Sequence, residues 1–214
     1  MALEIDHFVL GAASLEQGVA YISERCGVEV PKGGEHLQMG THNHVMSLGN
    51  ICYFEIIAIA PHLEAPKKPR QFDLDNPKQQ ARIAERPRIL TWVARTENVE
   101  NTLSQTSDDF GEIVAMQRGD LNWKLSIRED GSLPQQGLCP SIIEWKNNAP
   151  PLAKMTDLGC RFQNLTLMSS EQTRLANALS SIGVDHLVQI DPAGESPDRI
   201  KLEIATPRGS VMLD

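Results

Sequence analysis

Residues 5–27 read IDHFVLGAASLEQGVAYISERCG, a short apolar run followed by an amphipathic segment. The run Ile5–Leu10 is typical of a buried strand. Ser14 and Gln17 form a capping box, which commonly starts a helix, and Gly27 is the residue type that commonly ends one. Between these limits the apolar residues recur at helical spacing, at Leu15, Val19, Ile22 and Cys26. The stretch therefore predicts a strand followed by a helix.

Further strands complete this first unit. Gly33-Gly34 and Gly49-Asn50 indicate turns on either side of a strand at Thr41–Leu48. Ile51–Ala60 is the most apolar strand of the unit, and Pro61 ends it. The order is thus strand, helix and then strands.

The same order recurs later in the chain. A strand at Ile89–Ala94 precedes a helix at Val99–Gln105, and three strands follow at Gly111–Gln117, Trp123–Ile127 and Ser141–Lys146. A recurrence of this length indicates one structural unit that is used more than once.

A third and shorter unit begins with a strand at Phe162–Leu167. Ser170 is the expected cap of the next helix, which Gly183 ends. Ile200–Ala205 and Ser210–Leu213 then form a hairpin. The apolar stripe of the helix consists of Leu175, Ala178, Leu179 and Ile182.

The short strands and intervening helices favour the α+β class over a doubly wound parallel sheet. We expect one domain over 1–214, with module one at 1–60 and module two at 88–150. A proline-rich connector at 61–87 joins the modules, and a C-terminal strand–helix–hairpin unit (βαββ) occupies 155–214.

The charge balance argues against a nucleic-acid partner. Twenty Lys and Arg face 28 Asp and Glu among 214 residues, for a net charge of −8. No basic run is longer than Lys67-Lys68, so a phosphate backbone would be repelled.

Membrane insertion and secretion are not expected either. The longest apolar stretch, Ile56 to Pro61, is too short to span a bilayer, and the first six residues carry two acids and no base. The four cysteines lack CxxC spacing and are expected to be buried free thiols. These features favour a cytoplasmic protein.

Glu55 is the first candidate for a functional residue. It lies inside the apolar strand that ends module one, where Tyr53 and Ile57 share its face. An ionised carboxylate on a buried face costs several kcal/mol unless a partner compensates it. Glu203, by contrast, belongs to a strand of alternating apolar and charged residues and is expected to face water.

The second module repeats this anomaly at Glu144, inside the strand Ser141–Lys146. His7 shares the core-facing side of the first strand with Ile5 and Val9. If the sheets curl toward each other, one imidazole and two carboxylates could converge on a divalent cation. Alternatively, both acids are buried partners of Arg118 or Lys124, and His7 is a satisfied core histidine.

Several short motifs together resemble the glyoxalase-like domain family of the vicinal oxygen chelate superfamily. They are Asp6-His7, Gly33-Gly34-Glu35-His36, Gly40-Thr41-His42-Asn43, Ser47-Leu48-Gly49 and Tyr53-Phe54-Glu55, with Trp92, Trp123 and the turn at 206–209 in support. The resemblance implies paired βαβββ modules that form an open half-barrel around a cleft. It also implies a metal ion that holds two adjacent oxygens of a small substrate.

The resemblance places His7, Glu55 and Glu144 at three of the metal-ligand positions. The fourth falls on Thr91, where glyoxalase I would have His or Gln. Three ligands could still hold a metal and leave open positions. The set departs from glyoxalase I and also from extradiol dioxygenases, which need two His and one Glu.

His36 and Asn43 match the motif of the family and are candidate substrate contacts. Asn43 shares its strand face with Thr41, whereas His42 and His44 lie on the opposite face and are expected to point to solvent. His36 follows a flexible Gly-Gly pair, and functional residues are common in such loops. A histidine without a function in a surface loop would show the same sequence pattern.

Arg118, Trp123 and Lys124 are further substrate candidates, because they could bind an anion or a carbonyl group. A solvated strand edge would explain them nearly as well. Five of the six histidines lie within the first 62 residues, but only His7 is expected to be a ligand.

These residues favour a metal-dependent enzyme of the lyase or isomerase kind. Glu55 or Glu144 would act as general base, with a pKa raised by burial. The alternative is a metal-free binding or sequestration protein that uses the same cleft, which Thr91 favours. A structural or regulatory protein with a decayed cleft is a third hypothesis. A homodimer is left open.

Overall fold

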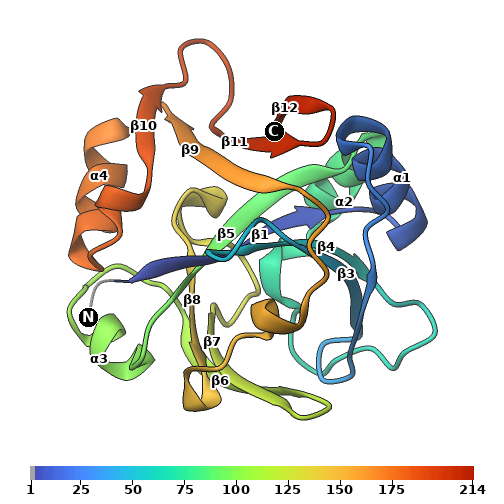
Figure 1. The fold of residues 1–214 in the computed structure, drawn as a ribbon. Coiled ribbons are helices and arrows are strands. Elements are labelled where there is room, and N and C mark those ends of the chain that lie inside the picture. The colour runs from blue at the N-terminus through green and yellow to red at the C-terminus, as the bar shows by residue number, and fades with distance from the viewer. Residues whose placement is uncertain (1–2) are drawn as a thin grey trace.

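The computed structural model describes residues 3–214, in which two sheets and four α-helices pack together (Figure 1). The larger sheet has eight strands in the order β2-β3-β4-β1-β5-β8-β7-β6. These strands are β1 (Glu4–Gly11), β2 (Lys32–His36), β3 (Thr41–Ser47), β4 (Tyr53–Ile59), β5 (Arg88–Arg95), β6 (Glu112–Arg118), β7 (Leu121–Ile127) and β8 (Ser141–Trp145).

The eight-stranded sheet consists of two equivalent halves. β1 and β5 pair antiparallel at its centre, while β1 pairs parallel with β4 and β5 pairs parallel with β8. Each half contains one strand–helix–strand–strand–strand module, with α1 (Leu15–Cys26) in the first and α3 (Val99–Ser104) in the second. The predicted α+β class and paired modules are confirmed.

Helix α1 shows how closely local sequence sets its limits. The amide of Gln17 donates to Ser14 Oγ at 3.2 Å, and Gln17 Oε1 accepts from the amide of Ala13 at 2.9 Å. Gly27 ends the helix in the left-handed conformation, with φ of 71°. The predicted start and end of this helix are both confirmed.

Gly33 and Gly34 lie within β2 rather than in a turn, which corrects the sequence analysis. A Cβ atom on Gly33 would lie 2.1 Å from Asn43 Oδ1, and one on Gly34 would lie 2.9 Å from Arg118 Cδ. The two glycines therefore allow side chains of β3 and β6 to approach the backbone of β2 closely.

The large sheet is a nearly closed barrel, whereas the resemblance implied an open half-barrel. Its edge strands β2 and β6 are bridged by Gln38, which donates to the carbonyl of Ala115 at 3.5 Å and accepts from the amide of Gln117 at 3.1 Å. The side chain of Arg118 reaches from β6 to Asn43 on β3. Side-chain contacts across the seam thus take the place of an eighth strand pairing.

The connector between the modules lies at one end of the barrel. It contains a short 3₁₀ turn (Gln71–Asp73) and α2 (Pro77–Glu85), whose amide at Lys78 donates to Asn76 Oδ1. The turn brings Phe72 into the apolar cluster inside the barrel.

A second sheet, of four strands, covers the outer face of the barrel in the order β10-β9-β11-β12. It comprises β9 (Arg161–Ser169), β10 (Gln189–Pro192), β11 (Arg199–Thr206) and β12 (Gly209–Leu213), with α4 (Gln172–Ser181) beside it (Figure 1). Strand β10 is short and polar, and the sequence pattern does not predict it. Ser170 is the cap expected for α4, but the helix begins one residue later, after Glu171.

Two apolar clusters lie on opposite faces of β1. Phe8 and Leu10 face outward and belong to the cluster that includes Leu165 and Leu202 of the second sheet. Val9 faces into the barrel and belongs to a smaller cluster there. Because adjacent residues of a strand point to opposite faces, one strand supports both the outer packing and the barrel interior.

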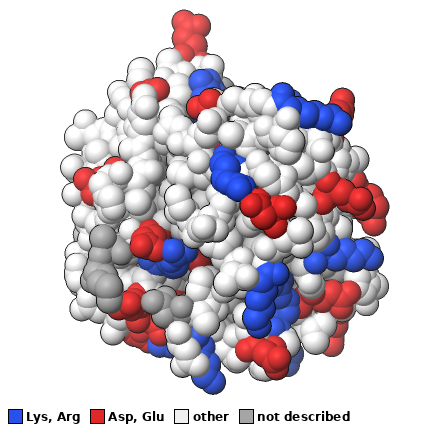
Figure 2. All heavy atoms as spheres, in the orientation of Figure 1, with Lys and Arg blue, Asp and Glu red and all other residues white. Residues whose placement is uncertain are grey.

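Three general features of the described residues concern surface charge, helix character and the cysteines. On the face shown in Figure 2, basic and acidic side chains are interspersed. Within residues 3–214, no helix has the length and apolar character needed to cross a bilayer. All four cysteines are free and buried, as expected.

Gly18 provides a test of the packing between α1 and the barrel. A Cβ atom there would lie 2.4 Å from Ile56 Cγ2. We expect Gly18→Ala to lower the free energy of unfolding by about 1–3 kcal/mol through overpacking, although alanine favours a helix. Urea denaturation measures the change. The control Glu24→Ala, on the exposed side of the helix, should stay within about 0.5 kcal/mol.

Candidate functional site

An irregularity in β1 places two polar residues side by side. Ile5 pairs with Ala94 and His7 with Val93, so Asp6 is an extra residue without a partner on β5. Such a bulge re-aims side chains and is common next to functional sites. Asp6 Oδ1 lies 2.7 Å from His7 Nδ1, and both side chains are buried.

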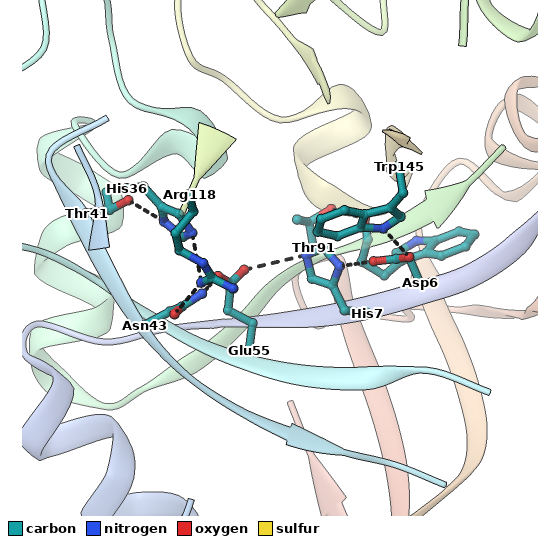
Figure 3. A network of polar contacts seen from close by, with 10 residues as sticks. Asp6, His7, His36, Thr41, Asn43, Glu55, Thr91, Arg118 and Trp145 are labelled. Carbon is teal, nitrogen blue, oxygen red and sulfur yellow. Dashed lines mark hydrogen bonds and ion pairs between the residues drawn. The ribbon is translucent and has the colours of Figure 1, made fainter. Parts of the chain in front are cut away.

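His7 lies between two carboxylates (Figure 3). Asp6 contacts its Nδ1 atom, while Glu55 Oε2 on the neighbouring strand β4 lies 3.5 Å from its Nε2 atom. Trp145 donates from Nε1 to the second oxygen of Asp6 at 2.9 Å, which holds that carboxylate in place. The imidazole also stacks on Tyr53, with 4.5 Å between ring centroids. The orientation of His7 is therefore fixed on three sides.

A second group of contacts extends from Glu55 toward the barrel seam (Figure 3). Asn43 donates from Nδ2 to Glu55 Oε1 at 2.5 Å, and its Oδ1 accepts from Arg118 Nη1 at 3.0 Å. The same arginine atom lies 3.4 Å from His36 Nε2. His36 Nδ1 in turn lies 3.0 Å from the hydroxyl of Thr41. Strands β2, β3, β4 and β6 thus contribute to one polar network.

This network borders a small cavity inside the barrel. Besides the polar residues, its walls include Tyr53, Phe72, Trp123 and Trp145. Water-sized molecules could place their centres in a volume of about 30 Å³. Since one water molecule needs about 10–15 Å³ of such space, the cavity holds roughly two or three groups of that size.

Glu55 and His7 shift each other's pKa, and Asp6 contributes to the shift of His7. Burial alone would lower the pKa of His7, but the hydrogen bond to Asp6 and the charges of Asp6 and Glu55 raise it to about 9. Burial alone would raise the pKa of Glu55, but the His7 imidazolium and the hydrogen bond from Asn43 lower it to about 2. The expected raised pKa of Glu55 is therefore wrong. At neutral pH the two residues form a buried ion pair.

His36 has the opposite character. Burial lowers its pKa to about 4, and the nearby Arg118 guanidinium contributes in the same direction. At neutral pH it is a neutral imidazole beside a cation.

Most of the sequence-based candidates line this one cavity. His7, Glu55, His36, Asn43, Arg118 and Trp123 all do so. His42 and His44, which were expected to point to solvent, lie outside it and are half-buried. His44 Nδ1 lies 2.7 Å from the carbonyl of Val30, and His42 packs against His62.

Glu144 and Lys124 are not part of the site, which corrects the prediction that Glu144 converges with His7 and Glu55. Glu144 Oε2 accepts from the amide of Val99 at 2.9 Å, at the start of α3. Its Oε1 lies 3.4 Å from Lys124 Nζ, which also binds Glu100 at 2.8 Å. For Glu144, the alternative of an acid paired with a base is the correct one.

The strand register explains the error. Val9 pairs with Glu55 in module one, and Val93 pairs with Ser141 in module two. Val9 and Val93 both precede their helix caps by five residues, so Ser141 is the structural counterpart of Glu55. Glu144 lies three residues further along, and an odd separation turns its side chain to the other face.

The donor set does not fit a divalent metal ion. Among the described residues, no three His, Cys, Asp or Glu side chains are grouped to hold one. His7 and Glu55 are two donors, whereas Ser141 occupies the counterpart of Glu55 and the Thr91 hydroxyl bonds the carbonyl of Gly137 at 3.1 Å. The cation of Arg118 would also oppose a metal ion nearby.

Sequence reasoning missed four residues of the site. Asp6 interrupts an apolar strand as Glu55 does, which was a usable signal. Tyr53 shares the face of Glu55, and Trp145 shares the face of Ile143. Gln71, which also lines the cavity, lies in the proline-rich connector and has no signal in the sequence.

Comparison with known families identifies the class of protein. A family model described as glyoxalase-like domain matches residues 5–183. The chain therefore belongs to the glyoxalase-like domain family, as the sequence resemblance indicated. A comparison with functionally curated proteins finds no match.

Several solved structures are similar to this chain at low sequence identity. A hypothetical protein from Staphylococcus aureus has 13% identity and a TM-score of 0.58, over 99% of this chain and 84% of that one. A methylmalonyl-CoA epimerase from Mycobacterium tuberculosis has 15% identity and a TM-score of 0.42, over 71% of this chain and 91% of that one. A methylmalonyl-CoA epimerase variant from Streptomyces coelicolor, in complex with 2-nitronate-propionyl-CoA, has 14% identity and a TM-score of 0.42. The match covers 67% of this chain and 98% of that one. The first of these likenesses shows the fold alone.

The ion pair predicts a specific dependence of stability on pH. The folded pKa of His7 is raised from 6.5 to about 9, so its contribution is complete below pH 6.5 and is lost as the pH rises through 9. The folded pKa of Glu55 is lowered from 4.5 to about 2, so its contribution is complete above pH 4.5 and is lost as the pH falls through 2. The pair therefore stabilises most between pH 4.5 and 6.5.

Urea denaturation at each pH gives the free energy of unfolding of the wild type and of the double variant His7→Gln, Glu55→Gln. The difference between the two values measures the contribution of the pair. NMR titration of the histidines gives a direct check, with the single variants His7→Gln and His36→Gln assigning the signals. We expect His7 to titrate near pH 9 and His36 near pH 4. A His7 signal that titrates near its ordinary 6.5 would contradict the ion pair.

Proposed function

We propose that the barrel interior binds a small anion with adjacent oxygen atoms and that Glu55 exchanges a proton with it. The reaction would be of the lyase or isomerase kind. The observation that carries this proposal is that Arg118 has no acidic partner among the described residues. Its guanidinium contacts the site, and it forms no ion pair with any described residue. A cation left without a counter-ion beside a buried polar site favours an anionic ligand.

The roles of the residues follow from their charges. Arg118 would bind a carboxylate or an oxyanion of the ligand, because a guanidinium offers several donors in one plane. The His7 imidazolium adds positive charge that stabilises an enolate-like oxygen. Glu55 is ionised at neutral pH and can accept a proton from carbon. Asn43 orients both Glu55 and Arg118 through its amide.

His36 and Trp123 complete the ligand contacts in this proposal. The neutral imidazole of His36 lies against the guanidinium of Arg118, and its ring meets Trp123 edge-on, with 6.0 Å between centroids. The two rings limit the space in front of Arg118, which favours a ligand of few atoms. The cavity holds only about two or three water-sized groups, so side chains that line it must move apart to admit a small acid.

A second candidate function is binding without turnover, which was the alternative from the sequence. The observation that favours it is the incomplete donor set, with Thr91 and Ser141 where metal-dependent relatives would have ligands. The metal ion implied by the resemblance would rest on His7 and Glu55 alone.

Small acids with adjacent oxygens test the binding proposal. We expect oxalate, pyruvate or hydroxypyruvate at millimolar concentration to raise the Tm of the wild-type protein. Arg118→Gln should weaken this binding at least tenfold, because a charge-assisted contact contributes about 1.5–3 kcal/mol. The matched variant Lys124→Gln removes one positive charge outside the site and should leave binding unchanged. Calorimetric titration measures both, and equal loss in both variants would contradict the assignment.

Hydrogen exchange separates the two candidate functions. In D₂O, the wild type should speed deuterium incorporation at C3 of pyruvate or hydroxypyruvate, because Glu55 removes a proton and an enolate forms beside Arg118. Glu55→Gln should abolish this exchange, since an amide does not act as the base. Binding with no exchange above the rate in buffer would support the binding protein instead.

Metal analysis tests the donor-set argument. We expect protein purified without a histidine tag to contain far less than one equivalent of Zn, Ni, Mn or Fe, and added metal to leave the Tm unchanged. The physical reason is that two donors beside a cation give a weak site. A stoichiometric metal that Glu55→Gln removes would overturn this expectation.

A further inference from the structure

Gln71 is a buried polar residue that the mechanism above does not use. It lies in the 3₁₀ turn of the connector, where its side chain lines the barrel cavity, and it is only 4% exposed. It therefore lines the same cavity as His7, Glu55 and Arg118, although it comes from a different part of the chain.

The side-chain oxygen of Gln71 has no hydrogen-bond partner among the described residues. A buried polar atom without a partner destabilises a protein, so such atoms are rare and need an explanation. The other polar side chains of the cavity differ in this respect. Glu55, Asn43, His36 and His7 all have partners at 3.5 Å or less. Within residues 3–214, Gln71 thus places in the cavity wall a buried acceptor that has no partner.

The backbone of the turn is constrained to present this side chain. Phe72 and Asp73, which follow Gln71, both have the left-handed conformation, with φ of 63° and 58°. This conformation is costly for residues other than glycine. It is held by the burial of Phe72 inside the barrel and by a 2.8 Å hydrogen bond from the amide of Asp73 to the carbonyl of Gly131. The turn cannot simply rotate Gln71 out to solvent.

The positions of the charged side chains indicate which group of a ligand would lie next to the free acceptor of Gln71. Arg118 and the His7 imidazolium provide for the negative end of a ligand, as proposed above. A free carbonyl oxygen at another point of the wall requires a hydrogen-bond donor on the ligand, and in a small acid this donor is a hydroxyl group. A ligand that lacked it would leave the oxygen unpaired, which disfavours such a ligand.

We propose that Gln71 is a specificity-determining residue whose Oε1 atom accepts a hydrogen bond from a hydroxyl group of the ligand, so that the site selects small hydroxy acids. This inference rests on the proposed function and names the substrate class for the same site. Hydroxypyruvate and pyruvate are a matched pair of probes, because they differ by one hydroxyl group next to the adjacent oxygens.

The experiment compares the two probes on the wild type, on Gln71→Met and on Gln79→Met by calorimetric titration and thermal unfolding. We expect the wild type to bind hydroxypyruvate roughly three- to tenfold more tightly than pyruvate. Gln71→Met should abolish this preference. The same variant should raise the Tm of the ligand-free protein by roughly 2–8 °C, because it removes an unpaired buried polar atom.

Gln79→Met is the matched control. Gln79 is equally a buried glutamine of the connector, but its Oε1 accepts from Arg82 at 3.4 Å and it does not line the barrel cavity. Its replacement should bring no gain in Tm and should leave the preference for hydroxypyruvate unchanged.

The outcomes distinguish this inference from the proposed function. If the wild type binds pyruvate as tightly as hydroxypyruvate, or if Gln71→Met keeps the preference, the role of Gln71 is overturned while the proposed function stands. A lower Tm for Gln71→Met with an unchanged preference would assign Gln71 a structural role and overturn the inference in the same way. If none of oxalate, pyruvate and hydroxypyruvate binds, the proposed function itself fails, and this inference fails with it.

Discussion

The antiparallel pairing of β1 and β5 is the constraint on which the rest of this structure depends. It joins the two modules into one barrel, and one apolar cluster packs on each face of β1. Its bulge at Asp6 brings a carboxylate next to His7, in a strand that otherwise needs to be apolar. A regular strand would turn the two side chains to opposite faces, and the buried imidazolium would lose a counter-ion.

The polar network shows how a barrel interior tolerates charge. His7 and Glu55 are both buried, and each compensates the desolvation of the other. Asp6 is held by Trp145, and Asn43 connects Glu55 to Arg118. The network is continuous from the centre of the sheet to the seam between its edges. Arg118 and the His7 imidazolium thus place positive charge within this network.

Local patterns predicted the elements well, and register limited the prediction of the site. The capping residues, the apolar stripe and Gly27 placed the first helix correctly, because all of these act within one turn of chain. The same kind of reasoning identified Glu55 from the apolar residues around it. It failed for Glu144, because an acid inside a strand faces the interior only if the register puts it there. The glycine pair at 33–34 was misread as a turn, since a close contact across strands leaves no trace in nearby residues.

The sequence by itself determined the α+β class, the repeated module and the presence of a buried carboxylate at Glu55. These follow from periodicity and composition, which are properties of short segments. Only the tertiary structure decided which side chains meet: that Arg118 rather than Lys124 reaches the site, that Asp6 supports His7, and that Gln71 enters from the connector. The physical reason is that these contacts join strands and turns far apart in the chain, so they depend on bulges, register and barrel closure that no single segment encodes.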